Sequence, residues 1–452
     1  MGTAKARAPP RTPATPTQPV ETSRHLPDKT FIIDNGAYMI KAGYASHAPA
    51  SDESVSSCSS IPNALVKTRD NKIVIGAQLA TVNDWNEAMF RRPVEKGYVV
   101  NWEAEREIWD QPGRHYLVLT EAPNALPILQ RHADEMVMEE WGFGGYARCL
   151  GPTLNAWNEI HSLFGDPLSN TSDASILPAD CLLVVDSGYS HTTVTPVYKG
   201  QALQRGIRRL DLGGKHLTNY LKEIVSMRQY NMVDESYIMN GVKEAVCYVS
   251  NNFAGDLERA WKNGRKRQSG PEEGIVLDYV LPDPNANKKG FIRPHDPLLH
   301  AKKKKGAASG LSTEVLSEDV LVLGNERFAV PELLFTPGDI GMKSAGIPDM
   351  ILQSLSVLPT GLHSAFLANV LVVGGNALIS GFMERLETEL RQIASAECVV
   401  RVRRAKDPIH STWLGGTRLA ANREELSKVS ITRQEYQEYG SGWAVRRFAG
   451  LV

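Results

Sequence analysis

Two short turns in this sequence each place a carboxylate beside small residues, a combination that suits phosphate and magnesium. Asp34-Asn35-Gly36 lies between the apolar run 31–33 and a second strand-like run, 39–44. Asn and Gly tolerate positive φ, so this stretch predicts a tight turn between two strands. Asp186-Ser187-Gly188 follows the apolar run 182–185 and precedes a β-branched strand. A carboxylate and free backbone N–H groups at such turns can hold a phosphate with its Mg²⁺.

A third glycine element occurs later in the chain. The apolar run 370–373 ends in Gly374-Gly375-Asn376. A single Asp-Asn-Gly turn is most often an ordinary hairpin. Two Asp-Gly hairpins followed by a strand and a Gly-Gly turn predict instead a nucleotide held between two similar halves of the chain.

Several further segments resemble the actin superfamily, which also includes chaperone ATPases and sugar kinases. In actin order, they are LVLTEAP (117–123), RLDLGGKHLTNYL (209–221), GNERFAVPELLF (324–335), GMKSAGI (341–347), WLGGTRLA (413–420) and ITRQEY (431–436). The resemblance covers nearly all of the chain after His25, and these segments resemble actin rather than the kinases. It implies an α/β, actin-like fold with two similar α/β domains around a nucleotide cleft.

The chain is therefore expected to leave one domain, build a second, and return to the first. A Pro-, Thr- and Ala-rich tail at 1–28 is expected to be disordered. Domain I is expected at 29–176 and 410–452, with a small subdomain at about 57–79. Domain II is expected at 177–409, with an outer subdomain at about 213–341 that contains a basic insertion at 263–319.

Composition is consistent with two domains. The 452 residues are 42% hydrophobic, enough for two cores, and the formal net charge of −1 does not indicate general nucleic-acid binding. No apolar run reaches the roughly 20 residues that a membrane helix requires. The 5 cysteines are scattered without a C-x-x-C pair, which argues against a zinc site or disulfide framework and favours the reducing cytosol or nucleus.

The resemblance to actin also implies roles for individual residues. Asp34 and Asp186 would hold Mg²⁺ through water, and Lys41 would neutralise phosphate charge. Gly36, Ser187 and Gly188 would offer backbone N–H groups to phosphates. The remaining residues expected at the bound ATP or ADP are Asn35, Gly214, Lys243, Glu244, Gly374, Gly375 and Asn376. The alternative is that these are turn glycines and a Lys-Glu pair on a helix surface.

Departures from actin affect hydrolysis more than binding. Ala37 lacks the hydroxyl that actin offers to the γ-phosphate, and Tyr38 adds bulk where the backbone should approach closely. Tyr189-Ser190 replaces an Asp and a Gly. The water-positioning Gln of actin falls near Cys149-Leu150, and its later His falls at Thr193. Because phosphoryl transfer depends on positioned water and charge stabilisation, we expect no catalytic residue and no enzymatic turnover.

Four segments are similar to the sixth class of nuclear actin-related proteins. They are FIIDNGAYMIKAGYA (31–45), IPNALVKT (61–68), DSGYS (186–190) and VLDYVLPDPNANKKGFIRP (276–294). The last is the most specific, because it lies in an insertion that actin lacks. This similarity implies a non-catalytic subunit of a SRCAP-type chromatin remodeller, which exchanges a variant histone. The implied partners are the Snf-type ATPase chain, a zinc-finger HIT-type subunit and the nucleosome, and the implied location is the nucleus and also the cytoplasm.

The basic insertion, 263–319, has two interpretations. It contains Arg265-Lys266-Arg267, Lys288-Lys289 and a lysine run at 302–305. One interpretation is a solvated loop, and the other is a surface for DNA phosphates or acidic partners. Between the basic runs, GIVLDYVLPD (274–283) predicts a pair of strands.

A second class of function remains open, that of a cytoplasmic actin-like ATPase or filament component. In actin, the region that matches 62–76 carries a long loop that contacts the next subunit of the filament. Here the span is much shorter, which argues against self-assembly into filaments.

Overall fold

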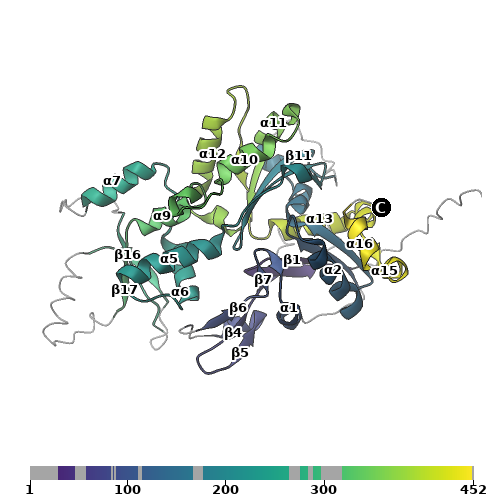
Figure 1. The fold of residues 1–452 in the computed structure, drawn as a ribbon, viewed down its shortest axis with the longest axis horizontal. Helices are drawn as coiled ribbons and strands as arrows, with labels where there is room; N and C mark the ends of the chain where they lie inside the picture. Colours follow the sequence, from purple (N-terminus) through teal and green to yellow (C-terminus); the bar gives the residue numbers. More distant parts are fainter. Residues whose placement is uncertain are drawn as a thin grey trace, which may run out of the picture.

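The fold consists of two sheet-centred halves that face each other (Figure 1). The computed structural model describes residues 29–45, 57–82, 85, 88–109, 115–165, 177–263, 275–283, 289–296 and 318–449. The predicted tail at 1–28 and the lysine run at 302–305 lie outside these residues.

The first sheet has the order β20-β10-β9-β1-β2-β3. Its strands are β1 (Thr30–Asn35), β2 (Met39–Tyr44), β3 (Ser59–Pro62), β9 (Tyr116–Glu121), β10 (Gly145–Leu150) and β20 (Ile431–Thr432). The predicted hairpin is present: β1 pairs with β2 antiparallel, and β9 pairs with β1 parallel. The apolar residues Ile32, Leu117 and Val118 are fully buried, which anchors the strands that end at the first turn.

The second sheet repeats this arrangement. Its order is β13-β12-β11-β18-β19, with β14 beside β12. Its strands are β11 (Cys181–Ser187), β12 (Thr192–Tyr198), β13 (Gln201–Ala202), β14 (Arg208–Leu210), β18 (Val370–Val373) and β19 (Val402–Arg404). A hairpin, β11–β12, again has a parallel strand, β18, on its other side. Both central hairpins therefore present their turns at a carboxyl edge of parallel strands, where ligands bind in open α/β sheets.

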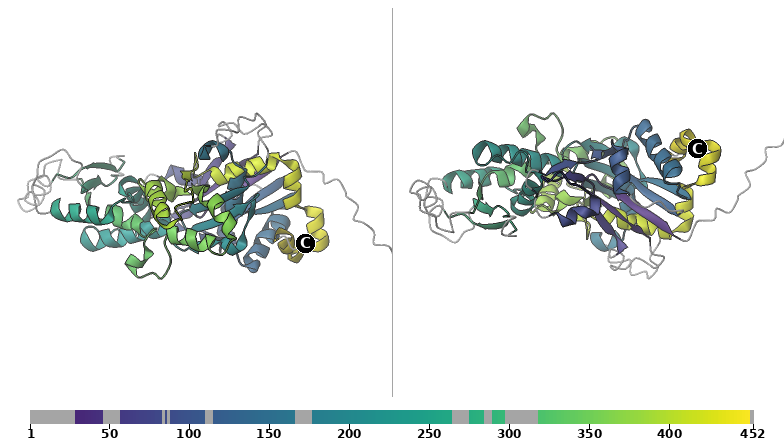
Figure 2. Two further views of the ribbon diagram at one scale, coloured as in Figure 1. Left: turned by 90° about the horizontal axis from the view of Figure 1, so that it is seen from above. Right: turned by 90° about the horizontal axis from the view of Figure 1, so that it is seen from below.

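Helices from both ends of domain I cover the first sheet. They are α1 (Trp102–Ile108), α2 (Pro127–Glu135), α3 (Gly151–Leu154), α13 (Ser411–Ala421), α14 (Arg423–Val429), α15 (Arg433–Tyr439) and α16 (Ser441–Phe448). The short helix α4 (His161–Phe164) belongs instead with the second sheet, since Phe164 lies in one buried cluster with Leu182 and Val184. Asn101 caps α1, since its side chain accepts from the Ala104 N–H at 3.0 Å. Trp413 of α13 is fully buried, and its indole donates to the Ile32 carbonyl at 3.3 Å. In both views of Figure 2, the yellow C-terminal helices lie beside the strands of the first sheet.

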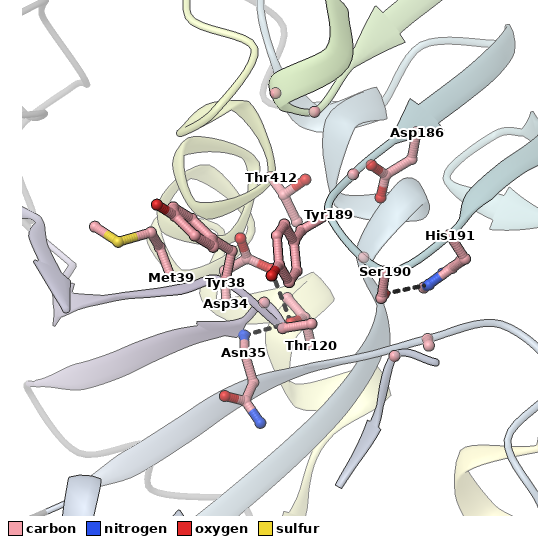
Figure 3. A pocket seen from close by; sticks show the side chains of 18 of the residues that line it. Asp34, Asn35, Tyr38, Met39, Thr120, Asp186, Tyr189, Ser190, His191 and Thr412 are labelled. Atoms are coloured by element: carbon pink, nitrogen blue, oxygen red, sulfur yellow. Dashed lines mark hydrogen bonds between the residues drawn. The ribbon is translucent and has the colours of Figure 1, made fainter. Parts of the chain in front are cut away.

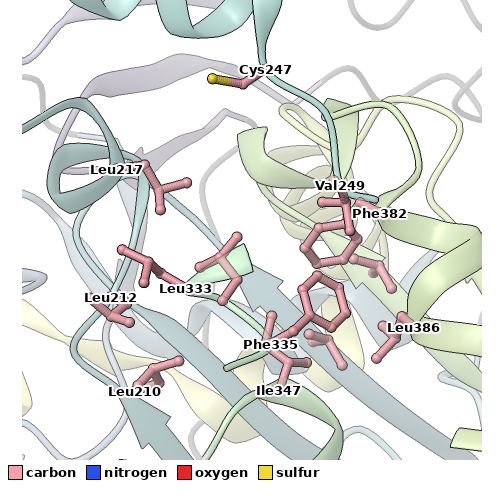
Figure 4. Close-up of a cluster of buried hydrophobic side chains, with 14 of the residues drawn as sticks. Leu210, Leu212, Leu217, Cys247, Val249, Leu333, Phe335, Ile347, Phe382 and Leu386 are labelled. Atoms are coloured by element: carbon pink, nitrogen blue, oxygen red, sulfur yellow. The ribbon is translucent and has the colours of Figure 1, made fainter. Parts of the chain in front are cut away.

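The second half has the larger core. Its helices are α5 (Gly214–Arg228), α6 (Ser236–Val246), α7 (Phe253–Asn263), α9 (Glu326–Glu332), α10 (Ile347–Leu355), α11 (Thr360–Leu367) and α12 (Phe382–Ile393). Phe382, Leu386 and Leu390 recur at helical spacing on α12 and are all fully buried, which fits a helix with one apolar face. Figure 4 shows Phe382 and Leu386 meeting Phe335 and Ile347 in this core.

Three small sheets complete the described chain. One contains β4 (Leu65–Lys67), β5 (Ile73–Ile75) and β6 (Met89–Arg91), and another is the hairpin of β7 (Val94–Glu95) and β8 (Tyr98–Val99). The third has the order β16-β15-β17, with β15 (Leu277–Val280), β16 (Phe291–Pro294) and β17 (Val320–Leu323). The predicted strand pair within 274–283 is therefore wrong: this stretch supplies one strand, and its partners come from later in the chain.

None of the helices in the described residues combines the length and the apolar character needed to cross a membrane.

Candidate functional site

A cavity of about 700 Å³ lies between the two hairpin turns. All the predicted site residues except Ser187 line it, so residues far apart in the sequence do meet in one place. Ser187 is fully buried behind the cavity wall, where its hydroxyl accepts from Asn376 Nδ2 at 3.1 Å and contacts Thr192 Oγ1 at 2.9 Å. Ser187 therefore supports the second turn instead of lining the cavity.

The first turn is held by a contact that the sequence did not predict. Thr120, at the end of β9, donates from Oγ1 to Asp34 Oδ1 at 2.9 Å and accepts from the Asn35 N–H at 2.9 Å (Figure 3). Asp34 also forms an ion pair with Lys41, whose Nζ lies 3.1 Å from Oδ2. The feature that could have indicated Thr120 is its position at the carboxyl end of a strand next to β1.

Asp186 differs from Asp34 in that none of the described residues donates a hydrogen bond to its carboxylate, although it lines the cavity. Burial raises the pKa of Asp186 to about 6; the nearby Asp34 carboxylate also raises it, and Lys41 opposes the shift. A buried carboxylate that faces a cavity beside another carboxylate favours a nearby cation. This geometry fits a Mg²⁺ ion, although no three His, Cys, Asp or Glu side chains of the described chain converge as a direct ligand set.

Two of the three backbone donors predicted for phosphate, Gly36 and Gly188, already donate to carbonyls of the protein. The Gly36 N–H donates to the Asp34 carbonyl and the Gly188 N–H donates to the His191 carbonyl, both at 3.1 Å. The next two N–H groups in each turn donate to no acceptor among the described residues; they belong to Ala37, Tyr38, Tyr189 and Ser190. Donors for an anion therefore lie one step further along each turn than the sequence suggested.

The rings of Tyr38 and Tyr189 occupy the space between the two turns. Their centroids are 4.8 Å apart, and Figure 3 shows them side by side within the cavity. The Arg92 guanidinium lies over both rings, 4.8 Å from the centroid of Tyr38 and 5.0 Å from that of Tyr189. Its Nη1 also donates to the carbonyls of Ala37, Tyr38 and Asn63 at 3.2–3.4 Å.

Tyr38 reaches across the cavity to α6. Its hydroxyl accepts from Asn240 Nδ2 at 3.4 Å. Burial, followed by the charge of Glu244, raises the pKa of Tyr38 to about 12, so the phenol stays neutral at physiological pH. The Tyr38 side chain, predicted to add bulk at the first turn, thus extends across the cleft and contacts both domains.

Residues predicted for the nucleoside are largely held by the protein itself. Lys243 donates from Nζ to Gly214 O at 3.2 Å, to Thr218 Oγ1 at 3.1 Å and to Asn240 Oδ1 at 2.8 Å. Burial lowers the pKa of Lys243. Asn376 donates to the Gly188 carbonyl at 2.9 Å. These contacts brace the cavity wall, and the lining still includes Glu244 and the Gly374-Gly375 turn.

The catalytic side of the site lacks a proton acceptor or water-positioning group at the predicted places. Neither Cys149 nor Leu150 lines the cavity, although the following residue, Gly151, does. His191 does line it, and its Nδ1 lies 2.7 Å from Ser190 Oγ. Burial, followed by the nearby Arg209 charge, lowers the pKa of His191 to about 3, so this ring remains neutral.

Comparison with known proteins agrees with this geometry. A family model described as Actin matches residues 26–449. The chain belongs to the actin family. The α/β fold with two similar halves around a cleft, predicted from the sequence, is therefore confirmed for this actin-family chain.

Three actin-related relatives are similar over nearly their full length. The chain is 68% identical to "Actin-like protein arp6" of Aspergillus fumigatus, over 100% of both chains. It is 48% identical to "Actin-related protein 6" of Neurospora crassa, over 94% of this chain and 95% of the relative. It is 35% identical to "Actin-related protein 6" of Dictyostelium discoideum, over 93% of this chain and 94% of the relative. The predicted resemblance to the sixth class of actin-related proteins is thus confirmed.

Proposed function

We propose that this protein is a non-catalytic actin-related subunit of a nuclear chromatin remodeller of the SRCAP type, where it supports histone-variant exchange through protein contacts. The relatives named actin-related protein 6 support the class. The observation that supports the non-catalytic role is the contact between Tyr38 and Tyr189, which places two aromatic rings between the turns, inside the cavity.

We expect no ATP turnover, because the two tyrosine rings and neighbouring groups stand where actin has groups that serve phosphoryl transfer. A phosphoryl-transfer site needs positioned water and uncommitted charge at the transferred group. In this cleft, Lys41 is paired with Asp34, and His191 is neutral. ATP or ADP with Mg²⁺ fits the Asp186 side of the cavity as a structural ligand, and the proposed role does not depend on its hydrolysis.

The proposed partners are the Snf-type ATPase chain of the remodeller, a zinc-finger HIT-type subunit and the nucleosome, and the proposed location is the nucleus with a cytoplasmic pool. The insertion that contains β15 and β16 is the proposed contact surface. Actin lacks this insertion, and its strands form an ordered sheet with β17 at the outer end of domain II. An ordered sheet offers a fixed surface to a partner, unlike a solvated loop.

Affinity purification from nuclear extract tests the proposal. The tagged full chain is compared with tagged conventional actin as a matched control, and co-purifying proteins are identified by mass spectrometry. We expect a remodeller ATPase and a zinc-finger HIT subunit in stoichiometric amounts with this chain and not with actin. Recovery of cytoskeletal proteins, or of no stoichiometric partner, would overturn the proposal.

A further inference from the structure

Contacts between side chains join the two domains at three levels of the cleft. The middle level is the pair Tyr38–Tyr189 with Arg92 above both rings. Tyr38 belongs to the β1–β2 turn and Tyr189 to the β11–β12 turn, so each ring comes from a different sheet. The bond from Asn240 to the Tyr38 hydroxyl adds a second tie to the opposite domain.

The outer level joins the small β4–β6 sheet to α6. The Trp85 ring stacks on Tyr237 with centroids 3.9 Å apart and planes inclined by 16°. Phe90 of β6 lies parallel to Tyr237, at 6.1 Å and 6°. Tyr237 and Asn240 are three residues apart on α6, so one helix face receives both the outer and the middle contacts.

The inner level joins the β7–β8 hairpin to the second domain. The Arg209 guanidinium lies 5.0 Å from the ring centroid of Tyr98, donates to its hydroxyl at 3.3 Å, and also donates to the Lys96 carbonyl. Lys96 Nζ lies 3.8 Å from Asp211 Oδ2, and Lys215 Nζ lies 3.4 Å from Glu95 Oε1. These partners alternate in charge across the cleft.

From these three levels we infer that the chain closes its own cleft: an aromatic and guanidinium clasp, centred on Tyr38, Tyr189 and Arg92, holds the two domains together without a bound nucleotide. Aromatic pairs and cation–π contacts gain strength as they lose contact with water, and Tyr38, Tyr189 and Arg92 are half-buried between the two domains. A ligand that reaches both turns must first separate Tyr38 from Tyr189. Binding of such a ligand therefore opposes closure of the cleft. The closed conformation forms without a ligand, so a partner can recognise it.

Solution scattering and hydrogen exchange on the full chain test the clasp. The protein is stripped of nucleotide with a chelator and a phosphatase, then measured alone, with Mg·ADP and with Mg·ATP. We expect the stripped protein to have a radius of gyration no larger than that of the protein with either nucleotide, and the Gly36 and Gly188 amides, which donate hydrogen bonds within the two turns, to be protected without any ligand. An open stripped protein that closes only when nucleotide is added would overturn the inference, and this comparison needs no variant.

Variants then assign the closure to the rings. The double substitution Tyr38→Ala, Tyr189→Ala should increase amide exchange in both turns at least tenfold and enlarge the radius of gyration. The double substitution Tyr38→Phe, Tyr189→Phe keeps the rings but loses the bond from Asn240 to the Tyr38 hydroxyl, so amide exchange should rise much less than in the double Ala variant. Tyr439→Ala, at an exposed position on α15, serves as the matched control. If the double Ala variant folds and stays as closed and protected as the control, the clasp is wrong.

Discussion

Lys41 and Asp34 face each other across the β1–β2 hairpin and form an ion pair, with Nζ 3.1 Å from Oδ2. Asp34 also accepts from Thr120 at 2.9 Å. The lysine charge is thus already matched by a carboxylate of the same turn. This pairing, together with the rings of Tyr38 and Tyr189, favours a cleft that stores or excludes a nucleotide over one that cleaves it.

We expect no ATP hydrolysis by the purified chain. Phosphate release under saturating Mg·ATP should stay at buffer background, because the actin water-positioning Gln and His fall near Cys149-Leu150 and at Thr193, and the nearby His191, with its pKa lowered to about 3, is a weak proton acceptor. Asp186→Asn should give the same background, and conventional actin serves as the positive control. Steady turnover that Asp186→Asn removes would show that the site is catalytic.

Arg92→Ala should destabilise the protein by about 2–4 kcal/mol, because it removes charged hydrogen bonds to three carbonyls and three cation–π contacts. Urea unfolding measures the change in free energy. The neighbouring Arg91 is exposed, so Arg91→Ala should stay within about 0.5 kcal/mol of the unmodified chain. Equal losses for the two variants would contradict the role given to Arg92.

Glu105 makes stability depend on pH. Its side chain is fully buried, Oε1 accepts from Trp109 Nε1 at 3.0 Å, and Oε2 has no partner among the described residues. Burial raises the pKa of Glu105 to about 7, and the nearby polar groups of Asn35, Trp109 and Asn63 oppose the shift. A carboxyl with a raised folded-state pKa stabilises the fold below its unfolded pKa of about 4.3, and this stabilisation is lost as pH rises through about 7.

Glu105→Gln should remove this loss, since the amide does not titrate. The variant should gain up to about 3 kcal/mol over the unmodified chain at pH 8, relative to their difference at pH 4.5. Denaturant unfolding at a series of pH values gives the comparison. Glu107→Gln, at an exposed position on the same helix, should show no such trend. A difference between Glu105→Gln and the unmodified chain that does not change with pH would contradict the prediction.

The chain should remain in the supernatant in a filament-pelleting assay with Mg·ATP. The region that would carry the filament loop is the short β4–β5 hairpin, which connects Lys67 to Ile73 through a tight turn. Such a hairpin does not reach far from its own sheet. Sedimentation of a large fraction of the protein, above a critical concentration as for actin, would revive the filament alternative.

Binding to nucleosomes should depend on salt through the lysine run at 302–305. Replacing these lysines with serine should weaken binding at low salt and make the dependence of log K on log salt less steep, by about one for each phosphate that is no longer neutralised. Electrophoretic shift titrations at several salt concentrations give both values. Unchanged affinity at low salt would favour the alternative interpretation, in which the insertion is a solvated loop that does not contact DNA.

Local residue chemistry was sufficient to predict parts of the fold and site. The apolar run 31–33 followed by Asn35-Gly36 specifies a hairpin, and the spacing of Phe382, Leu386 and Leu390 specifies a one-sided helix. Contacts that depend on register between distant strands were not predictable in this way. Thr120 meets Asp34 only because β9 pairs with β1, and 274–283 gives one strand because its neighbours are supplied by later residues.

The return of the chain to the first sheet also determines the order in which a nascent chain can fold. Trp413 covers Ile32 across 381 residues, and β20 completes the edge beside β10. The second sheet is instead built from one uninterrupted stretch, from Cys181 to Arg404. On the ribosome, the second domain can therefore fold while the first still exposes an apolar sheet face. Until Trp413 has been synthesised, Ile32 therefore lacks the side chain that covers it in the folded protein.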